Sequence, residues 1–299
     1  MSNQNSWYGQ WVLAATTGKT AGKTFIVADS TNSNINFIND FYNPDSDGTA
    51  RRLSTITAAI AACTADNGDV IYVAPGHTET VIGAAGLAVN VAGISIIGLG
   101  NGTLRPTINF TTAITASMDV TAANVTFQNM IFTVWFDAIT AMINVSTAGV
   151  SFLDCQFNTN NATMWVVLWI LTAATASELV VKGCRFQWPA VNSGTTTTAQ
   201  IKHEVWVDYV IEDNYFTGKM TQSILNATAL LRGSIHNNRF VVATGTKAIA
   251  VHASSTPFIS NNRINVPSGT APIVAAAGFV AGNVYSAAVG VTAGTASTI

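Results

Sequence analysis

YVIEDNYF (Tyr209–Phe216), GSIHNNRF (Gly233–Phe240) and PFISNNRI (Pro257–Ile264) are versions of one phrase that recurs through the C-terminal half of the chain. Four further versions are VTFQNMIF (Val125–Phe132), VSFLDCQF (Val150–Phe157), LVVKGCRF (Leu179–Phe186) and FVAGNVYS (Phe279–Ser286). The bulky residue near the end of the phrase recurs every 21 to 30 residues. Self-similarity at such a period is typical of a protein built from stacked repeats.

Each phrase begins with alternating apolar residues, which predicts a half-buried β-strand. A short polar residue or a cysteine follows, and we expect this column to form a tight turn with left-handed backbone angles. Stacked turns lie about 4.8 Å apart, so side chains of the column can hydrogen-bond up the stack. The predicted turn ladder consists of Cys155, Cys184, Asn214, Asn238, Asn262 and Asn283, preceded by Met130. The aromatic residue two positions later should point inward and stack on its equivalents.

The fold class that these phrases predict is all-β: a single-stranded right-handed parallel β-helix, in which each coil adds one strand to each of about three parallel sheets. The repeat length varies because polar, turn-rich insertions such as 187–199 project as loops from one face.

The sequence also predicts where the β-helix begins. The run STITAAIAAC (Ser54–Cys63) predicts a short helix with Ser54 as its N-cap, followed by a β-rich segment. Such a capping helix would cover the open end of the solenoid. We therefore divide the chain into an extended N-terminal arm (1–45), the β-helix (46–290) and a C-terminal tail (291–299).

The opening of the β-helix carries a family resemblance. Residues Asp47–Val81 and Gly93–Phe110 resemble the opening of pectin lyase-like right-handed parallel β-helix proteins, and are more similar still to those encoded by tailed bacteriophages. The close match covers roughly residues 45 to 110. The resemblance implies a virion structural protein, synthesised in the host cytoplasm and located in the virion, although a fold does not by itself fix a function.

Composition narrows the function classes. The formal net charge of −2 offers no electrostatic footprint for a nucleic acid or an acidic membrane, so we expect neither as a partner. The N-terminal MSNQNSW lacks the basic and apolar regions of a secretion signal, and the longest apolar run, MWVVLWIL (Met164–Leu171), is too short to span a bilayer. The three cysteines are interpreted as small buried hydrophobic residues, not as a disulfide framework.

Catalytic chemistry has one candidate region, where His203, Glu204, Asp208, Glu212 and Asp213 lie close together. Enzymes on this fold need paired carboxylates, or a calcium-binding carboxylate cluster with a base. We interpret Asp213 as a turn residue that caps backbone amides, with a hydrolase pair as the alternative. No glycine-rich phosphate loop or zinc motif is present. The prediction is a protein that is not an enzyme, with no catalytic, cofactor-binding or metal-binding residue and no cofactor.

Partner binding is predicted at two groups of aromatic residues. The first is the N-terminal arm, which either packs back on the solenoid or docks on a neighbouring protein through Trp7, Tyr8, Trp11 and Phe25. The second is a strand face that carries Trp165 and Trp169, which we assign to an oligomer interface in preference to a sugar platform. Arg185, Arg239 and Arg263 share an outward repeat position and predict a solvated or subunit-facing ladder; an anionic-glycan groove is the alternative.

The predicted function is that of a phage capsid decoration (cement) protein. It would bind the major capsid protein on the capsid surface as a homotrimer and stabilise the shell. The alternative is a tail spike or fibre that binds or cleaves host surface polysaccharide. The thin tail AAVGVTAGTASTI disfavours the spike because it offers no added receptor-binding domain.

Overall fold

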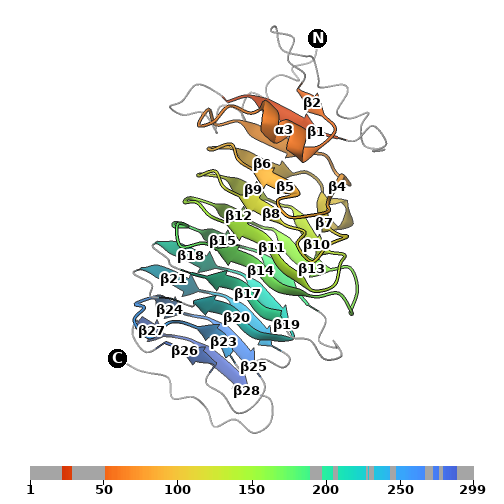
Figure 1. Ribbon diagram of the computed structural model, residues 1–299. Coiled ribbons are helices and arrows are strands. Elements are labelled where there is room, and N and C mark those ends of the chain that lie inside the picture. The colour runs from red at the N-terminus through yellow and green to blue at the C-terminus, as the bar shows by residue number, and fades with distance from the viewer. Residues whose placement is uncertain are drawn as a thin grey trace, which may run out of the picture.

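The chain forms a β-solenoid of about eight turns built from parallel strands. The structure is a computed structural model that describes residues 22–28, 51–188, 197–204, 208–226, 228, 232–242, 247–266, 272–275 and 279–287. These residues are all-β apart from helix α3 (Ile56–Ala62) and the short 3-10 turn η1 (Gly102–Leu104). The coils stack from β1 and β2 at one end to β26, β27 and β28 at the other (Figure 1).

Three parallel sheets form the sides of the solenoid. Sheet A contains, in spatial order, β2 (Arg52–Leu53), β1 (Thr24–Val27), β3 (Val70–Val73), β6 (Ser95–Gly98), β9 (Thr126–Gln128), β12 (Ser151–Leu153), β15 (Val180–Lys182), β18 (Tyr209–Glu212), β21 (Gly233–His236), β24 (Phe258–Ser260) and β27 (Phe279–Ala281). Sheet B contains β4 (Thr78–Val81), β7 (Thr107–Phe110), β10 (Ile131–Val134), β13 (Gln156–Thr159), β16 (Arg185–Gln187), β19 (Tyr215–Gly218), β22 (Arg239–Val242), β25 (Arg263–Val266) and β28 (Val284–Ala287). Sheet C contains β5 (Leu87–Val89), β8 (Met118–Val120), β11 (Ile139–Val145), β14 (Val166–Thr172), β17 (Thr197–His203), β20 (Met220–Asn226), β23 (Lys247–Ala250) and β26 (Ile273–Val274).

The recurring aromatic residue forms the centre of the core on sheet B. In the parallel register each of these phenylalanines pairs with its equivalent in the next coil: Phe132, Phe157, Phe186, Phe216 and Phe240. All are fully buried, and neighbouring ring centroids lie 4.3 to 5.1 Å apart in stacked geometry. The inward aromatic stack expected from the phrases is therefore present, and it fixes the register of every coil that it crosses.

The corner between sheets A and B holds the ladder column. Asn214, Asn238 and Asn262 are buried, and each side-chain oxygen accepts from the backbone N–H of the preceding rung at 2.8 to 3.0 Å. The left-handed backbone angles that we expected in this column lie one residue earlier instead. That earlier position has φ between 53° and 65° and holds Asn129, Asp154, Gly183, Asp213, Asn237, Asn261 and Gly282. The chain thus turns at an exposed Asn, Asp or Gly and then points the next side chain inward.

Cys155 and Cys184 belong to the ladder column, and each thiol donates to a carbonyl one coil back. The Sγ atom of Cys184 lies 3.3 Å from the carbonyl oxygen of Phe152, one coil back, and Asn214 Nδ2 donates to the equivalent carbonyl of Val181 at 2.8 Å. A thiol offers a weak donor but no amide oxygen. The acceptor side of the ladder therefore begins only at Asn214.

Helix α3 lies at the start of the solenoid. Its N-cap is Thr55, whose hydroxyl accepts from the N–H of Ala58 at 3.1 Å, so the predicted Ser54 cap is displaced by one residue. Ile56, Ala59 and Ile60 are buried in the core, as their helical spacing indicated.

Part of the predicted arm belongs to the solenoid. Strand β1 lies between β2 and β3 in sheet A, and Phe25 pairs with Ile71. The side-chain carboxylate of Asp69 fixes the start of this strand by accepting from the backbone N–H of Lys23 at 2.6 Å. Residues 1–21, 29–45 and the tail 291–299 lie outside the described residues.

Candidate functional site

A column of cationic and aromatic side chains crosses the outer face of sheet B. Arg185, Tyr215, Arg239 and Arg263 occupy equivalent positions of β16, β19, β22 and β25, and their neighbours along each strand point into the core. The Arg185 guanidinium lies 5.3 Å from the centroid of the Tyr215 ring, and the Arg239 guanidinium lies 5.2 Å from it. Because these arginines come from the coils on either side of Tyr215, they cover both faces of its ring.

The outer face of sheet B carries no acidic residue among the described positions. Its outward residues are Thr78, Thr80, Thr107, Asn109, Ile131, Thr133, Gln156, Asn158, Arg185, Gln187, Tyr215, Thr217, Arg239, Val241, Arg263, Asn265 and Val284. Amides and hydroxyls alternate with the arginine column along the strands. The face is therefore positive and rich in hydrogen-bonding groups, and its charge increases toward the C-terminal coils.

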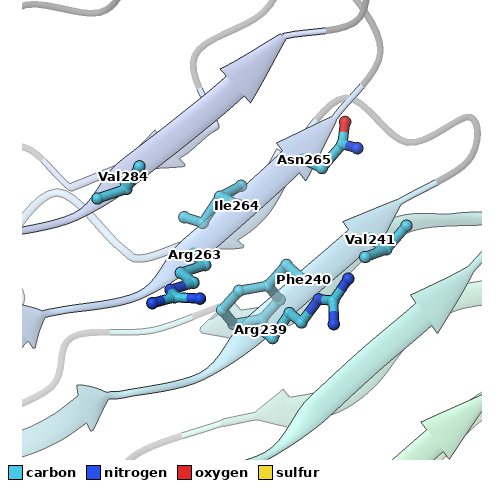
Figure 2. Close-up of a pocket in the computed structure, with 7 residues that line it drawn as sticks. All are labelled: Arg239, Phe240, Val241, Arg263, Ile264, Asn265 and Val284. Atoms are coloured by element: carbon cyan, nitrogen blue, oxygen red, sulfur yellow. The ribbon is translucent and has the colours of Figure 1, made fainter.

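A groove of about 490 Å³ lies over the C-terminal end of this column. Its lining comes from three neighbouring strands: Arg239, Phe240, Val241, Arg263, Ile264, Asn265 and Val284 (Figure 2). The lining combines two guanidinium groups with apolar surface, since Val284 is 62% exposed. This combination suits a ligand that is anionic and in part apolar.

A second candidate surface follows the turns that lead from sheet B to sheet C. Ile82, Ile114 and Trp135 are 63%, 52% and 45% exposed and lie in these turns in three successive coils. Backbone hydrogen bonds join the turns, from Ser117 to Gly83 at 3.0 Å and from Thr140 to Ile114 at 2.9 Å. We call Ile82, Ile114 and Trp135 the B–C ridge. Large apolar side chains exposed in neighbouring turns mark a surface that contacts another molecule.

The structure corrects two of the predicted partner-binding residues. Phe25 and Trp169 are fully buried in the core and offer no surface to a partner. Trp165 is half-buried and packs against the same core cluster that contains Trp169. Trp7, Tyr8 and Trp11 lie outside the described residues.

Trp169 points into the core where the pairing of β14 with β11 is interrupted. Ala141 pairs with Leu168 and Ile143 with Ile170, so Trp169 falls between two paired positions. It joins Ile170 in the core although the two are adjacent in sequence, so the strand does not keep strict alternation. The face that the even parity of Trp165 and Trp169 indicated is therefore turned toward the core and not toward a partner.

The acidic region contains paired side chains. The Glu212 carboxylate accepts a hydrogen bond from Lys182 at 2.5 Å, and this hydrogen bond raises the pKa of Lys182. Glu212 also lies 3.2 Å from His236 Nε2. Asp208 binds Arg232 at 2.8 Å, and Glu204 binds Lys202 at 2.5 Å. Asp208 directly precedes β18 and Glu212 is its last residue. Their Cα atoms are about 13 Å apart if the chain between them is extended, whereas the carboxyl groups of a glycosidase pair are about 5 to 9.5 Å apart.

The remaining two residues of the acidic region are the buried His203 and the exposed Asp213. Burial lowers the pKa of His203 well below its ordinary value, and the ring lies 3.5 Å from the Thr172 hydroxyl. Asp213 has a left-handed φ of 57°, which places it at the turn position that precedes the ladder. Among the described residues, no group of three or more His, Cys, Asp or Glu side chains is arranged to hold a metal ion.

Sequence reasoning missed Tyr215 and the B–C ridge. Tyr215 occupies the arginine position in YVIEDNYF, so aligning the phrases could have placed an aromatic ring between Arg185 and Arg239. Ile82 and Ile114 lie where the phrases do not recur, and no periodic signal marks them.

Comparisons with known proteins identify no relative of this chain. No family model, no curated protein and no solved structure matches it. Within the described part of the chain, no helix is long and apolar enough to cross a membrane.

Proposed function

We propose that this chain is a structural protein of a tailed-phage virion, of the capsid decoration type, and that it acts without catalysis. In this proposal a right-handed β-helix, capped by helix α3, lies on the capsid surface after synthesis in the host cytoplasm. It contacts the major capsid protein and further copies of itself as a homotrimer. The family-like opening of the β-helix, residues 45 to 110, supports the phage origin.

The B–C ridge is the observation that carries the proposal. One large apolar side chain per coil is exposed in three successive turns: Ile82 and Trp135 directly follow β4 and β10, and Ile114 lies further along its turn, before β8. Tryptophan is enriched at the centre of protein–protein interfaces, and exposed apolar surface beside it marks a contact with another molecule. Hydrogen bonds between the coils hold these turns in place, so a partner binds them without ordering the chain first.

The pairing of the acidic residues supports a role without catalysis. Asp208, Glu204 and Glu212 each have a basic partner within hydrogen-bond distance. A general acid or base works best with a pKa near the operating pH and with access to the substrate. Carboxylates held by Lys or Arg are arranged to stabilise the fold and less suited to proton transfer.

The first test is the copy number of this protein in purified virions, measured by quantitative mass spectrometry against the major capsid protein. A ratio of one per capsid subunit, or a simple fraction of it, supports decoration. Absence from the virion, or a handful of copies, contradicts it.

The second test isolates the ridge. The triple variant Ile82→Ser, Ile114→Ser, Trp135→Ser should lose binding to purified capsids that lack the protein. Leu104→Ser is the matched control, because Leu104 is 52% exposed but lies in η1, between sheets A and B. Equal capsid binding by the triple variant and by the wild type would exclude the ridge as the contact.

The second candidate function is a tail spike or fibre that binds or cleaves host polysaccharide. The acid-free outer face of sheet B favours it, because its amides, hydroxyls and arginines extend along several coils. A handful of copies per particle, together with particle adsorption that purified host polysaccharide inhibits, would favour this function.

A further inference from the structure

The C-terminal part of the arginine column carries uncompensated positive charge. In earlier coils the turn beside the column holds Asp154 or Asp213, but beside Arg239 and Arg263 the same position holds Asn237 or Asn261. Among the described residues, Arg239 and Arg263 make no ion pair. Two guanidiniums on adjacent strands, about 4.8 Å apart at the backbone, repel each other unless an anion lies between them.

Apolar surface adjoins these two arginines. Val284 continues the column on β28, and Val241 lies beside Arg239 on β22. Across the ladder corner, on the outer face of sheet A, Phe258 and Phe279 are 46% and 39% exposed and stack at 4.7 Å. Arginine and aromatic residues next to apolar surface are the composition of an interface hot spot.

The aromatic geometry argues against a sugar or a nucleobase as the ligand. Either would need an open ring face on which to stack. Both faces of Tyr215 are covered by guanidiniums, and Phe258 and Phe279 pack against each other.

We propose that the groove lined by Arg239, Arg263 and Val284 binds an acidic segment of a partner protein. Carboxylates of Asp or Glu bridge the two guanidiniums through bidentate hydrogen bonds, and apolar side chains of the same segment cover Val284 and Val241. This site lies on a different part of the solenoid from the B–C ridge. It rests on the proposed function only in that both require a protein partner.

The test measures binding of fluorescein-labelled poly-L-glutamate to the full chain by fluorescence anisotropy, at low salt and at about 0.15 M salt. The variant Arg239→Gln, Arg263→Gln should weaken binding by about tenfold or more, since two sets of charge-assisted hydrogen bonds are lost. The control Arg232→Gln, Lys247→Gln removes the same charge from other parts of the surface and should change binding less than about twofold. Because all four side chains lie outside the hydrophobic core, thermal unfolding should show that both variants fold.

Three outcomes overturn the proposal. The first is that poly-L-glutamate does not bind the wild type. The second is that both double variants bind it as the wild type does, and the third is that both lose affinity equally. Binding of polygalacturonate, but not poly-L-glutamate, in a manner that depends on Arg239 and Arg263 would assign the groove to an anionic glycan instead. None of these results bears on the copy number in virions, so the binding assay can contradict the groove proposal without contradicting the proposed function.

Discussion

Asn214 donates two hydrogen bonds to the side-chain oxygen of Asn238, one from its backbone N–H and one from Nδ2, and both are 3.0 Å long. Asn238 repeats this arrangement toward Asn262, and Asn262 toward Asn283. Each Nδ2 also donates to a carbonyl one coil back. The ladder therefore satisfies both groups of every buried amide, as burial requires.

Replacing Asn238 with Leu should destabilise the fold. The change leaves the N–H of Asn214 and the carbonyl of Ile211 without the partners that the amide supplied. Losing such buried hydrogen bonds predicts a decrease of about 2 to 4 kcal/mol in the free energy of unfolding, measured by denaturant titration. Asn265→Ala, at an exposed position, should stay within about 0.5 kcal/mol of the wild type. An unchanged unfolding midpoint for Asn238→Leu would show that the ladder is dispensable.

Replacing Cys184 with Asn should extend the ladder by one rung. An amide there can still donate to Phe152, as the thiol does, and it adds an oxygen that can accept from the N–H of Cys155. The expected gain is about 0.5 to 1.5 kcal/mol in the free energy of unfolding, measured beside Cys184→Ser, which supplies no amide oxygen. If the Asn variant is less stable than the Ser variant, the amide does not fit this position.

Truncating a ring of the core stack should lower the free energy of unfolding far more than truncating a ring of the exposed Phe258–Phe279 stack. Phe186→Ala removes a buried ring that stacks at 4.3 Å on Phe157 and at 4.8 Å on Phe216, so we expect a loss of about 3 to 5 kcal/mol. Phe258→Ala removes a half-exposed ring and should lose less than about 1.5 kcal/mol. The two losses are compared by denaturant titration, and similar values would contradict the assignment of the core.

Acidification should destabilise the protein through His203. Burial holds its pKa in the folded state below that in the unfolded chain, which is about 6.5. Between these two pKa values the unfolded state binds more protons, so stability decreases as the pH falls below about 6.5, by up to about 1.4 kcal/mol per pH unit. His203→Gln should flatten this dependence when stability is measured from pH 7.5 to pH 5. His252→Gln, at an exposed position, is the control and should leave the slope unchanged; an unchanged slope in His203→Gln would contradict the prediction.

The cysteines should resist thiol reagents in the native state. Burial raises the pKa of Cys63 to about 12 and that of Cys184 well above its ordinary value, so the reactive thiolate is scarce at both. Cys155 is buried, and the reagent has no access to it. At pH 8, Ellman's reagent should label all three thiols in denaturant and none in the native protein over the same time. Rapid native labelling of any cysteine would show that its coil opens readily.

The repeated phrases made much of the fold predictable. The column of Phe157, Phe186 and Phe216 gave the register, because each side chain must reach the same position of the core. Strand β1 was not predictable in this way, since Phe25 belongs to no phrase and its pairing with Ile71 is a contact between distant segments. The left-handed turn residue was misplaced by one position because Asn occurs at both positions in NNRF and NNRI.

The candidate surfaces were less predictable than the fold. The outward position of Arg185, Arg239 and Arg263 followed from strand alternation, and the register places them there. Alternation failed at Trp169, because the adjacent residues Trp169 and Ile170 both lie in the core. Exposure of the B–C ridge depends on turn conformations, which no period in the sequence encodes.

The ladder and the strands share one direction, because every hydrogen bond between coils runs along the stack. A force that pulls the two ends of the solenoid apart therefore acts on the contacts between neighbouring coils one after another. We expect the coils to detach from an end one at a time. Asn214, Asn238 and Asn262 are 24 residues apart, so each coil released there lengthens the chain by about 80 Å when fully extended. A force across the rod meets many strands at once. The protein should thus resist sideways load and yield in regular steps under tension, which single-molecule stretching would record as a sawtooth.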